Sequence, residues 1–282
     1  MLGQQLYTSY KNKNTMLSSY LALRNLWAMQ FMLIASVTFL EAQNLPESYM
    51  QLADDFKKNA QPDSALIYYE KASVEFQKLG DLESLANVYN QMGIIRTRQD
   101  KYEPAKKYLE KALQIGHTSL DSNNLTTAVT YISLGVVYTA EEKYEQALIF
   151  HHQALAIRLS KLGEYHADVA TSYGNIGNVY FKSKDYDQAI EAHQKARNIR
   201  AKIFGENSAE IIESFKGLGN AYREKKDYKI ALEYFEKALQ NKIVQRGLGH
   251  AELAKFYKDI SNVYYLMGDK VQGDLYKSKS GN

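Results

Sequence analysis

Apolar positions along most of the chain follow the spacing of amphipathic helices, and these helices come in pairs. Within residues 128–163, a first apolar stripe falls at i, i+3, i+4 and i+7, as on one face of an α-helix; it consists of Tyr131, Leu134, Gly135 and Tyr138. A polar break at residues 141–143 follows. A second stripe then repeats the spacing with Ala147, Phe150, His151 and Ala154. The pattern predicts a helix, a turn and a second helix.

This pattern returns along the chain with a period of 42. Columns of identical residues keep this step through four successive repeats: Gly93, Gly135, Gly177 and Gly219; Tyr102, Tyr144, Tyr186 and Tyr228; Tyr138, Tyr180, Tyr222 and Tyr264; and the pairs Ala105/Ala112, Ala147/Ala154, Ala189/Ala196 and Ala231/Ala238. Such self-similarity predicts a repeat architecture. A single helix pair cannot bury its apolar face alone, so the pairs are expected to stack as a solenoid over residues 43–282. The expected repeats are approximately 46–80, 86–121, 128–163, 170–205, 212–247 and 254–282.

The N-terminal stretch, residues 1–42, differs from the repeats. From Leu26 to Leu40 no residue carries a charge, and Lys11, Lys13 and Arg24 precede this run. A basic stretch, an apolar run of about 7–15 residues and a small residue at the cleavage point are typical of a secretory signal peptide. We therefore expect residues 1–42 to be cleaved after Ala42 and the rest to be exported to the periplasm or the extracellular space. The alternatives are a membrane anchor over residues 26–40 and a hydrophobic helix that caps the next domain, and Met16 is an alternative start.

Composition narrows the classes of function. The chain has 35 Lys and Arg against 32 Asp and Glu, a net charge of +3. Removal of residues 1–42 leaves 32 basic residues against 31 acidic ones, a net charge of +1, which disfavours a nucleic-acid binder. The chain has no cysteine, which excludes disulfides, thiolate zinc sites, iron–sulfur clusters and cysteine nucleophiles. Its 3 prolines suit a mainly helical chain.

The repeat columns resemble those of tetratricopeptide repeats (TPRs). In one repeat they are Ile176-Gly177, Tyr180, Tyr186, Ala189 and Ala196. The period of 42, longer than the usual 34 or so, and the segment at residues 163–170 are similar to those of the kinesin-light-chain subtype, whose bacterial members are often exported or multidomain proteins. The resemblance covers residues 46–282. It implies an all-α, right-handed α-solenoid of about six TPR helix–turn–helix repeats, and a protein-interaction scaffold that binds peptides on its concave face.

The first helix of each repeat should expose the side opposite its packing stripe, and the resemblance makes that side the peptide-binding face. Three asparagines recur on it with the period of the repeat: Asn178, Asn220 and Asn262. The other polar candidates are Asn175, Lys182, Lys216, Arg223 and Lys258, and the apolar groove candidates are Ile94, Ile132 and Val136. A carboxamide offers donors and an acceptor, so it can pair with the backbone of an extended chain. The cations favour an acidic ligand, an effect that Glu213, Glu224 and Asp259 reduce. Alternatively, these asparagines are ordinary solvated positions, or the groove is filled by a segment of the chain itself or by a second copy of it.

No pattern indicates catalysis, a cofactor or a metal site. His151 and His152 are adjacent, so they diverge by about 100° on a helix and chelate one ion poorly. His151 and His193 share a column in which an aromatic ring packs, which indicates core positions. His166 and His250 precede first helices and are expected to be turn or cap residues. HExxH, GxSxG and glycine-rich phosphate-loop motifs do not occur. We expect a non-enzyme whose partners are proteins or peptides, without nucleic acid or small-molecule substrate, and with membrane contact only through an uncleaved N-terminal segment.

Three functions from different classes follow. The first is a scaffold that holds an extended or helical segment of a partner protein in the concave groove. The second is the regulatory front part of a larger effector, such as a caspase-like (CHAT) peptidase or a signalling kinase, with its chemistry beyond Asn282. The third is a self-assembling array. In the last repeat Gly273 and Ser280 stand where the two alanines are expected, so this repeat is either a polar cap or a junction.

Overall fold

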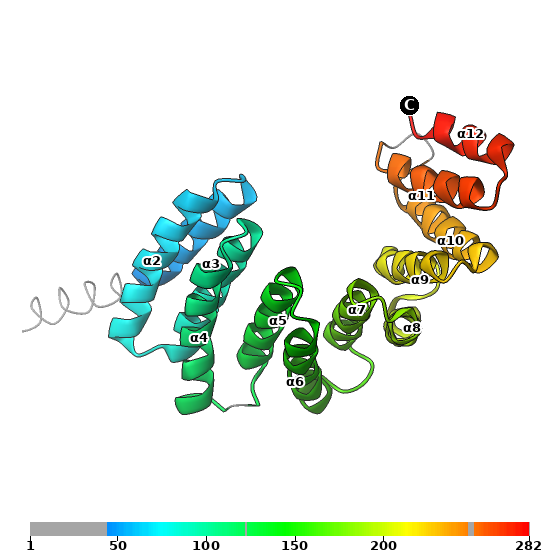
Figure 1. The fold of residues 1–282 in the computed structure, drawn as a ribbon. Coiled ribbons are helices and arrows are strands. Elements are labelled where there is room, and N and C mark those ends of the chain that lie inside the picture. Colours follow the sequence, from blue (N-terminus) through cyan, green and yellow to red (C-terminus); the bar gives the residue numbers. More distant parts are fainter. Residues whose placement is uncertain (1–43, 122, 248–250, 282) are drawn as a thin grey trace, which may run out of the picture. The chain divides into compact units, whose positions relative to one another are not determined.

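The computed structural model describes residues 44–121, 123–247 and 251–281, and these residues are all-helical (Figure 1). The expected signal peptide and His250 lie outside the described residues. A helix at residues 44–58 comes first. The others are α2 (Pro62–Leu79), α3 (Leu82–Arg98), α4 (Tyr102–Thr118), α5 (Leu125–Ala140), α6 (Tyr144–Leu162), α7 (Ala167–Lys182), α8 (Tyr186–Phe204), the short 3-10 helix η1 (Ala209–Ile211), α9 (Ile212–Glu224), α10 (Tyr228–Arg246), α11 (Leu253–Leu266) and α12 (Lys270–Lys279). Among these helices, none combines the length and the apolar content needed to cross a bilayer.

The chain divides into two compact units, of which the first ends at Asp81 and the second begins at Leu82. In the first unit the helix at residues 44–58 packs against α2. The rings of Phe56 and Tyr68 stack with their centroids 5.3 Å apart. The buried Tyr69 donates its hydroxyl hydrogen to the Asp54 carboxylate at 2.6 Å. One helix pair therefore has its own small core.

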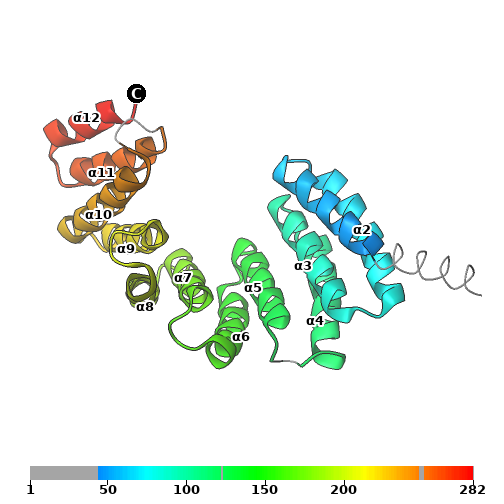
Figure 2. The same cartoon turned by 180° about the vertical axis from the view of Figure 1, so that it is seen from behind.

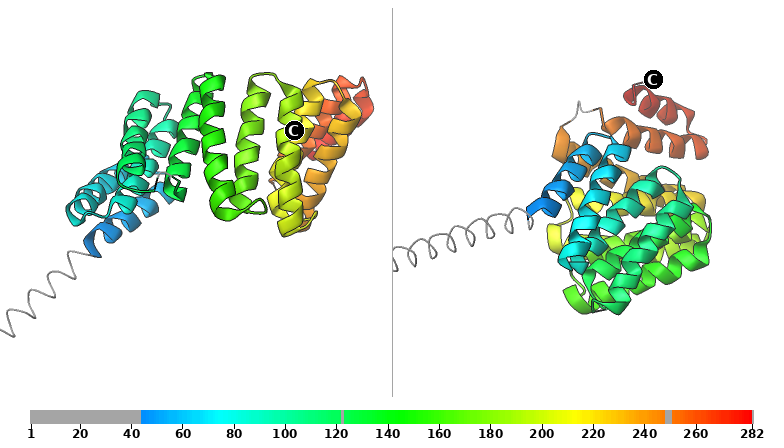
Figure 3. Two further views of the ribbon diagram at one scale, coloured as in Figure 1. Left: turned by 90° about the horizontal axis from the view of Figure 1, so that it is seen from below. Right: turned by 90° about the vertical axis from the view of Figure 1, so that its left-hand side faces the viewer.

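In its described residues, the second unit is a row of five helix pairs in chain order: α3/α4, α5/α6, α7/α8, α9/α10 and α11/α12. Figures 1 and 2 show each pair beside the next, and the left panel of Figure 3 shows the same row from below. The first helices α3, α5 and α7 each also contact the first helix of the following pair. The exposed sides of the first helices α3, α5, α7, α9 and α11 form the first-helix face. Within its described residues the second unit has the α-solenoid arrangement expected from the sequence period.

The repeated glycines allow the two helices of a pair to approach each other closely. A Cβ added to Gly135 would lie 2.6–2.8 Å from the His151 ring, and one on Gly219 would lie 2.8–3.0 Å from the Phe235 ring. Gly177 meets the His193 ring in the same way, at 2.9 Å. His151 and His193 are only 1% and 3% exposed, which confirms their expected core positions. Glycine in the first helix therefore makes room for a ring from the second.

The turn inside each helix pair has the same backbone conformation, although the residue types do not indicate it. Equivalent residues of successive repeats adopt the left-handed region at the end of each first helix: Asp100, Glu142, Lys184, Lys226 and Gly268, with φ between 57° and 83°. The next residue donates its backbone N–H to the carbonyl five residues earlier, as in the bond from Lys143 to Tyr138 at 2.8 Å. Such a bond closes a helix C-terminus and satisfies one of its free carbonyls.

The contact between α11 and α12, the last helix pair, differs from the contacts within the other pairs. Gly273 replaces an alanine of the column, and the Tyr265 ring lies where a Cβ on Gly273 would be. The Ser261 hydroxyl donates to the Gly273 carbonyl at 2.8 Å, and the Tyr265 hydroxyl donates to Asp274 at 2.6 Å. Polar bonds therefore replace part of the apolar packing between α11 and α12.

Candidate peptide-binding face

Several of the expected binding residues meet around one hollow between α5 and α7. The hollow measures about 230 Å³ and is lined by Val136, Thr139, Ala140, His151, Asn175, Asn178, Val179 and Lys182. Four of these residues were candidates from the sequence alone: Val136, Asn175, Asn178 and Lys182. Thr139, Ala140 and Val179 were not, although each lies within four residues of a candidate on the same helix. We call this place the α5–α7 hollow.

The polar groups of the α5–α7 hollow are available to a ligand. Asn178 and Lys182 are exposed, and Asn175 is half-buried. Within the described part of the chain, neither carboxamide makes a side-chain hydrogen bond and Lys182 has no ion pair. Val136 beside them is 43% exposed. The hollow thus combines an apolar wall with two uncommitted carboxamides and one uncommitted ammonium group.

His151 contributes a neutral ring to this hollow. Burial lowers the pKa of its imidazole to about 4, and the neighbouring His152 adds a smaller effect in the same direction. The ring is therefore uncharged at neutral pH, which makes it a poor general acid. Its Nδ1 is buried and has no hydrogen-bond partner among the described residues. No group of three or more His, Asp or Glu in the described ranges could hold a metal ion.

The other polar candidates lie on α9 and α11, where charges compensate one another. Lys216 pairs with Glu213 and Arg223 pairs with Glu224, both at 3.2 Å. Asp259 stands among Lys216, Arg223 and Lys258. Burial raises the pKa of its carboxyl, while the three cations act in the opposite direction. Asn220 is half-buried and Asn262 exposed. This part of the first-helix face therefore offers amides with a largely neutralised charge.

The remaining apolar candidates lie apart from the hollow. Ile94 is half-buried on α3. Ile132 packs against the core cluster of Ala128, Tyr131, Ala154 and Ile157. Only Val136 of the three apolar candidates lines the α5–α7 hollow. Ile132 and Val136 are four residues apart on α5, and the core residues Leu134 and Val137 lie beside them on the helix.

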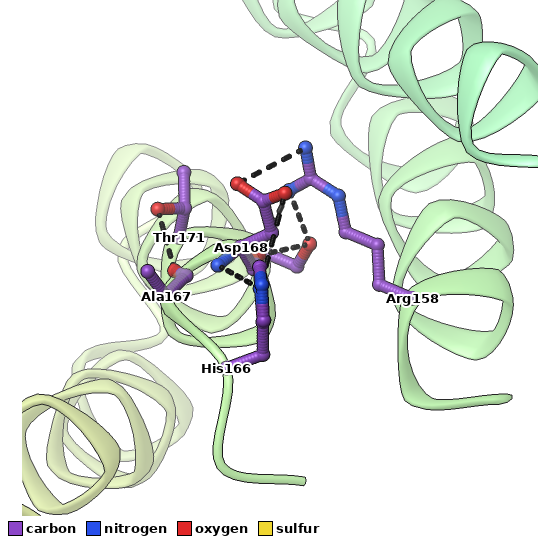
Figure 4. A network of polar contacts seen from close by, with 6 residues as sticks. Arg158, His166, Ala167, Asp168 and Thr171 are labelled. Atoms are coloured by element: carbon purple, nitrogen blue, oxygen red, sulfur yellow. Dashed lines mark hydrogen bonds and ion pairs between the residues drawn. The ribbon is translucent and has the colours of Figure 1, made fainter. Parts of the chain in front are cut away.

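A buried arginine joins α6 to α7 below the hollow. Arg158 donates to the backbone carbonyl of Asp168 at 2.8 Å and to the Ser172 hydroxyl at 3.0 Å, and Figure 4 shows its guanidinium facing Asp168. His166 caps α7 by accepting the Asp168 N–H on Nδ1 at 3.1 Å, as expected from its position before a first helix. The Arg and Ser positions recur in the next repeat, where Arg200 donates to Ser214 at 2.6 Å. Sequence reasoning missed this link, although the paired Arg and Ser columns carry its signal.

The family follows from the four matches along the chain. A protein-family model described as "Tetratricopeptide repeat" matches residues 44–117, 84–160, 126–202 and 168–243. The chain belongs to the tetratricopeptide repeat family. Proteins of this family generally serve as scaffolds for protein–protein interactions. A search of curated proteins finds no match.

Solved structures show the same fold at low sequence identity. BtubC (BKLC) from P. vanneervenii has 17% identity and a TM-score of 0.63, covering 85% of this chain and 89% of the other. A putative kinesin light chain with TPR-like repeats from Podosopora anserina has 19% identity and a TM-score of 0.62, covering 73% and 97%. PilF of Pseudomonas aeruginosa has 17% identity and a TM-score of 0.59, covering 84% and 90%. The kinesin-light-chain-like spacing of this TPR protein thus has structural counterparts.

Proposed function

We propose that this TPR protein binds an extended or helical segment of a partner protein on its first-helix face. The α5–α7 hollow is the observation that carries the proposal, because polar groups without internal partners surround a partly apolar wall. The carboxamides of Asn175 and Asn178 can each give and accept a hydrogen bond, which suits a peptide backbone. An apolar side chain of the same peptide would lie against Val136, Ala140 and Val179.

The charges of the first-helix face give it only a mild preference for an acidic ligand. Lys182 and Lys258 have no ion pair within the described residues, whereas Lys216 and Arg223 pair with Glu213 and Glu224. Complementary charges mainly set the specificity and the speed of association. We infer that the ligand segment is weakly acidic and that the amides and the apolar wall contribute most of the affinity.

Substitution of the asparagine column tests the proposal. We expect Asn178→Ala, Asn220→Ala and Asn262→Ala together to weaken partner binding roughly tenfold or more, since each lost hydrogen bond costs about 0.5–1.5 kcal/mol. The measurement is the affinity, by surface plasmon resonance, for the protein that the wild type retains from an extract of its own cells.

A matched variant controls for the loss of surface amides. Gln146, Gln153 and Gln240 are exposed carboxamides on the second helices α6 and α10. Their joint replacement by Ala should leave the affinity unchanged. Equal affinity of the wild type and the asparagine variant would remove the first-helix face from the proposed function.

A further inference from the structure

A second hollow lies at the turns of the last two repeats, apart from the α5–α7 hollow. It measures about 580 Å³ and is lined by residues 226–230, at the start of α10, and by Leu266 and Met267, at the end of α11. We call it the turn-edge hollow. Three of its side chains are large, aliphatic and exposed: Ile230 (38%), Leu266 (52%) and Met267 (40%). Val271, four residues after Met267, is 77% exposed.

The other repeats provide an internal comparison for this place. The positions equivalent to Met267 in two earlier repeats hold Lys225 and Glu141. Lys225 forms an ion pair with Asp187, and Glu141 forms one with Lys106 at 2.9 Å. Each pair joins one repeat to the next. At the last junction the residues equivalent to Asp187 and Lys225 are Lys229 and Met267, which cannot form an ion pair.

The change from polar to apolar extends to the neighbouring positions. Leu266 stands where earlier repeats have Lys182 and Glu224, and Ile230 stands where they have Gln188 and Gln146. The Leu266 position also holds Ala140, and the Met267 position also holds Ser183. Stacking of the helices therefore does not require large aliphatic residues at these positions, because polar or small residues stand there elsewhere in the array. Exposed apolar residues that gather around a hollow mark an interaction surface.

The charges at the rim of the turn-edge hollow favour an acidic partner. Lys226 and Lys229 line the hollow and are exposed, and the exposed Lys270 follows Met267 by three residues. Asp227 also lines the hollow and reduces this preference. Asp269 accepts the backbone N–H of Gln272 at 3.0 Å and so caps α12. A basic rim around an apolar hollow complements an apolar side chain with acidic neighbours.

We propose that the turn-edge hollow is a second docking site, which takes an apolar anchor residue flanked by acidic residues in a segment of a partner protein. The site is concave, with a volume of about 580 Å³, and its lining includes both Lys and Asp residues, which suits a peptide better than an anionic lipid surface. The geometry therefore favours a protein segment over a membrane. The site is separate from the α5–α7 hollow, so each can be tested without the other.

The test uses a random-peptide display library selected on the full chain. We expect one class of enriched peptides to carry a Leu, Ile, Met or Phe among Asp or Glu residues. These peptides should lose about tenfold or more in affinity, roughly 1.4 kcal/mol, with the variant Leu266→Ser/Met267→Ser. Reversal of the rim charges by Lys229→Glu/Lys270→Glu should weaken them as well and reduce the salt dependence of their binding.

Two control variants test whether the loss of affinity is specific to the turn-edge hollow. Ile149 and Val244 are also exposed aliphatic residues, 58% and 66%, on the second helices α6 and α10. The variant Ile149→Ser/Val244→Ser and a variant of the α5–α7 hollow, Asn175→Ala/Asn178→Ala, should both bind these peptides as the wild type does. Thermal unfolding of each variant checks that it is folded.

Three outcomes would overturn this second site. The first is that no enriched class combines an apolar residue with acidic neighbours. The second is that all such peptides bind the Leu266→Ser/Met267→Ser variant with unchanged affinity. The third is that vesicles of phosphatidylcholine and phosphatidylserine bind through Leu266 and Met267 while no peptide does, which would make the patch a membrane contact.

Discussion

Acidification from neutral pH to about pH 4 should lower the free energy of unfolding by about 3 kcal/mol for each of His151 and His193, since one pKa unit corresponds to about 1.36 kcal/mol. Burial lowers both imidazole pKa values from 6.5 to about 4, with smaller effects from His152 and Arg200 respectively. Between these values the unfolded chain binds protons that the folded chain does not. Stability is therefore complete above about pH 6.5 and is lost as the pH falls towards the folded-state pKa.

Denaturant titrations at several pH values would measure this loss, with His151→Phe/His193→Phe as the comparison. Phenylalanine suits the column because Phe235 occupies the equivalent position two repeats after His151. The double variant should lose markedly less stability than the wild type between about pH 6.5 and pH 4. Carboxylates such as Asp259 titrate in both proteins, so the difference between them isolates the histidines. Parallel pH curves would show that the two rings do not carry the acid sensitivity.

Replacement of Gly135 by Ala should destabilise the protein by about 1–3 kcal/mol, the usual cost of overpacking a core. The new Cβ would lie 2.6–2.8 Å from three ring atoms of His151. Because that ring is buried between the two helices, it cannot move aside without disturbing its neighbours. The shift of the denaturation midpoint measures the cost.

Gly174 provides the matched control on the next first helix. A Cβ there would meet only Arg200, at 3.9–4.0 Å. Gly174→Ala should therefore stabilise α7 by about 0.5–1 kcal/mol, the ordinary gain from removing a glycine from a helix interior. In a His151→Ala background the cost of Gly135→Ala should largely disappear. Equal effects of the two glycine substitutions would contradict the close ring contact.

The helix pairs could be predicted from the sequence because each repeat must bury the same stripe. Glycine at 93, 135, 177 and 219 and a bulky residue in the second helix are two sides of one contact, so both recur with the period. The left-handed turn residues could not be predicted. Glu142, Lys184 and Lys226 give no sign of a positive φ, which Gly268 and, more weakly, Asp100 would suggest.

The candidate site was only partly predictable, for a different reason. The period indicates which side of each first helix is exposed, but not how the side chains at a given junction fill the space. Asn178 reaches an open hollow because Val136 and Ala140 leave room beside it. Ile132, one turn earlier on α5, is half-buried and packs against a core cluster. The link from Arg158 to Ser172 also depends on contacts between repeats, which no single repeat reveals.

Site-specific photo-cross-linking tests the central claim most directly. A benzoyl-phenylalanine at position 178, on the first-helix face, is compared with one at position 153, an exposed position on the second helix α6. In extracts of its own cells, the protein labelled at position 178 should cross-link to one short segment of a partner protein, and the protein labelled at position 153 should not. Cross-linking of that partner at position 153 with none at position 178 would contradict a peptide-binding role for the first-helix face.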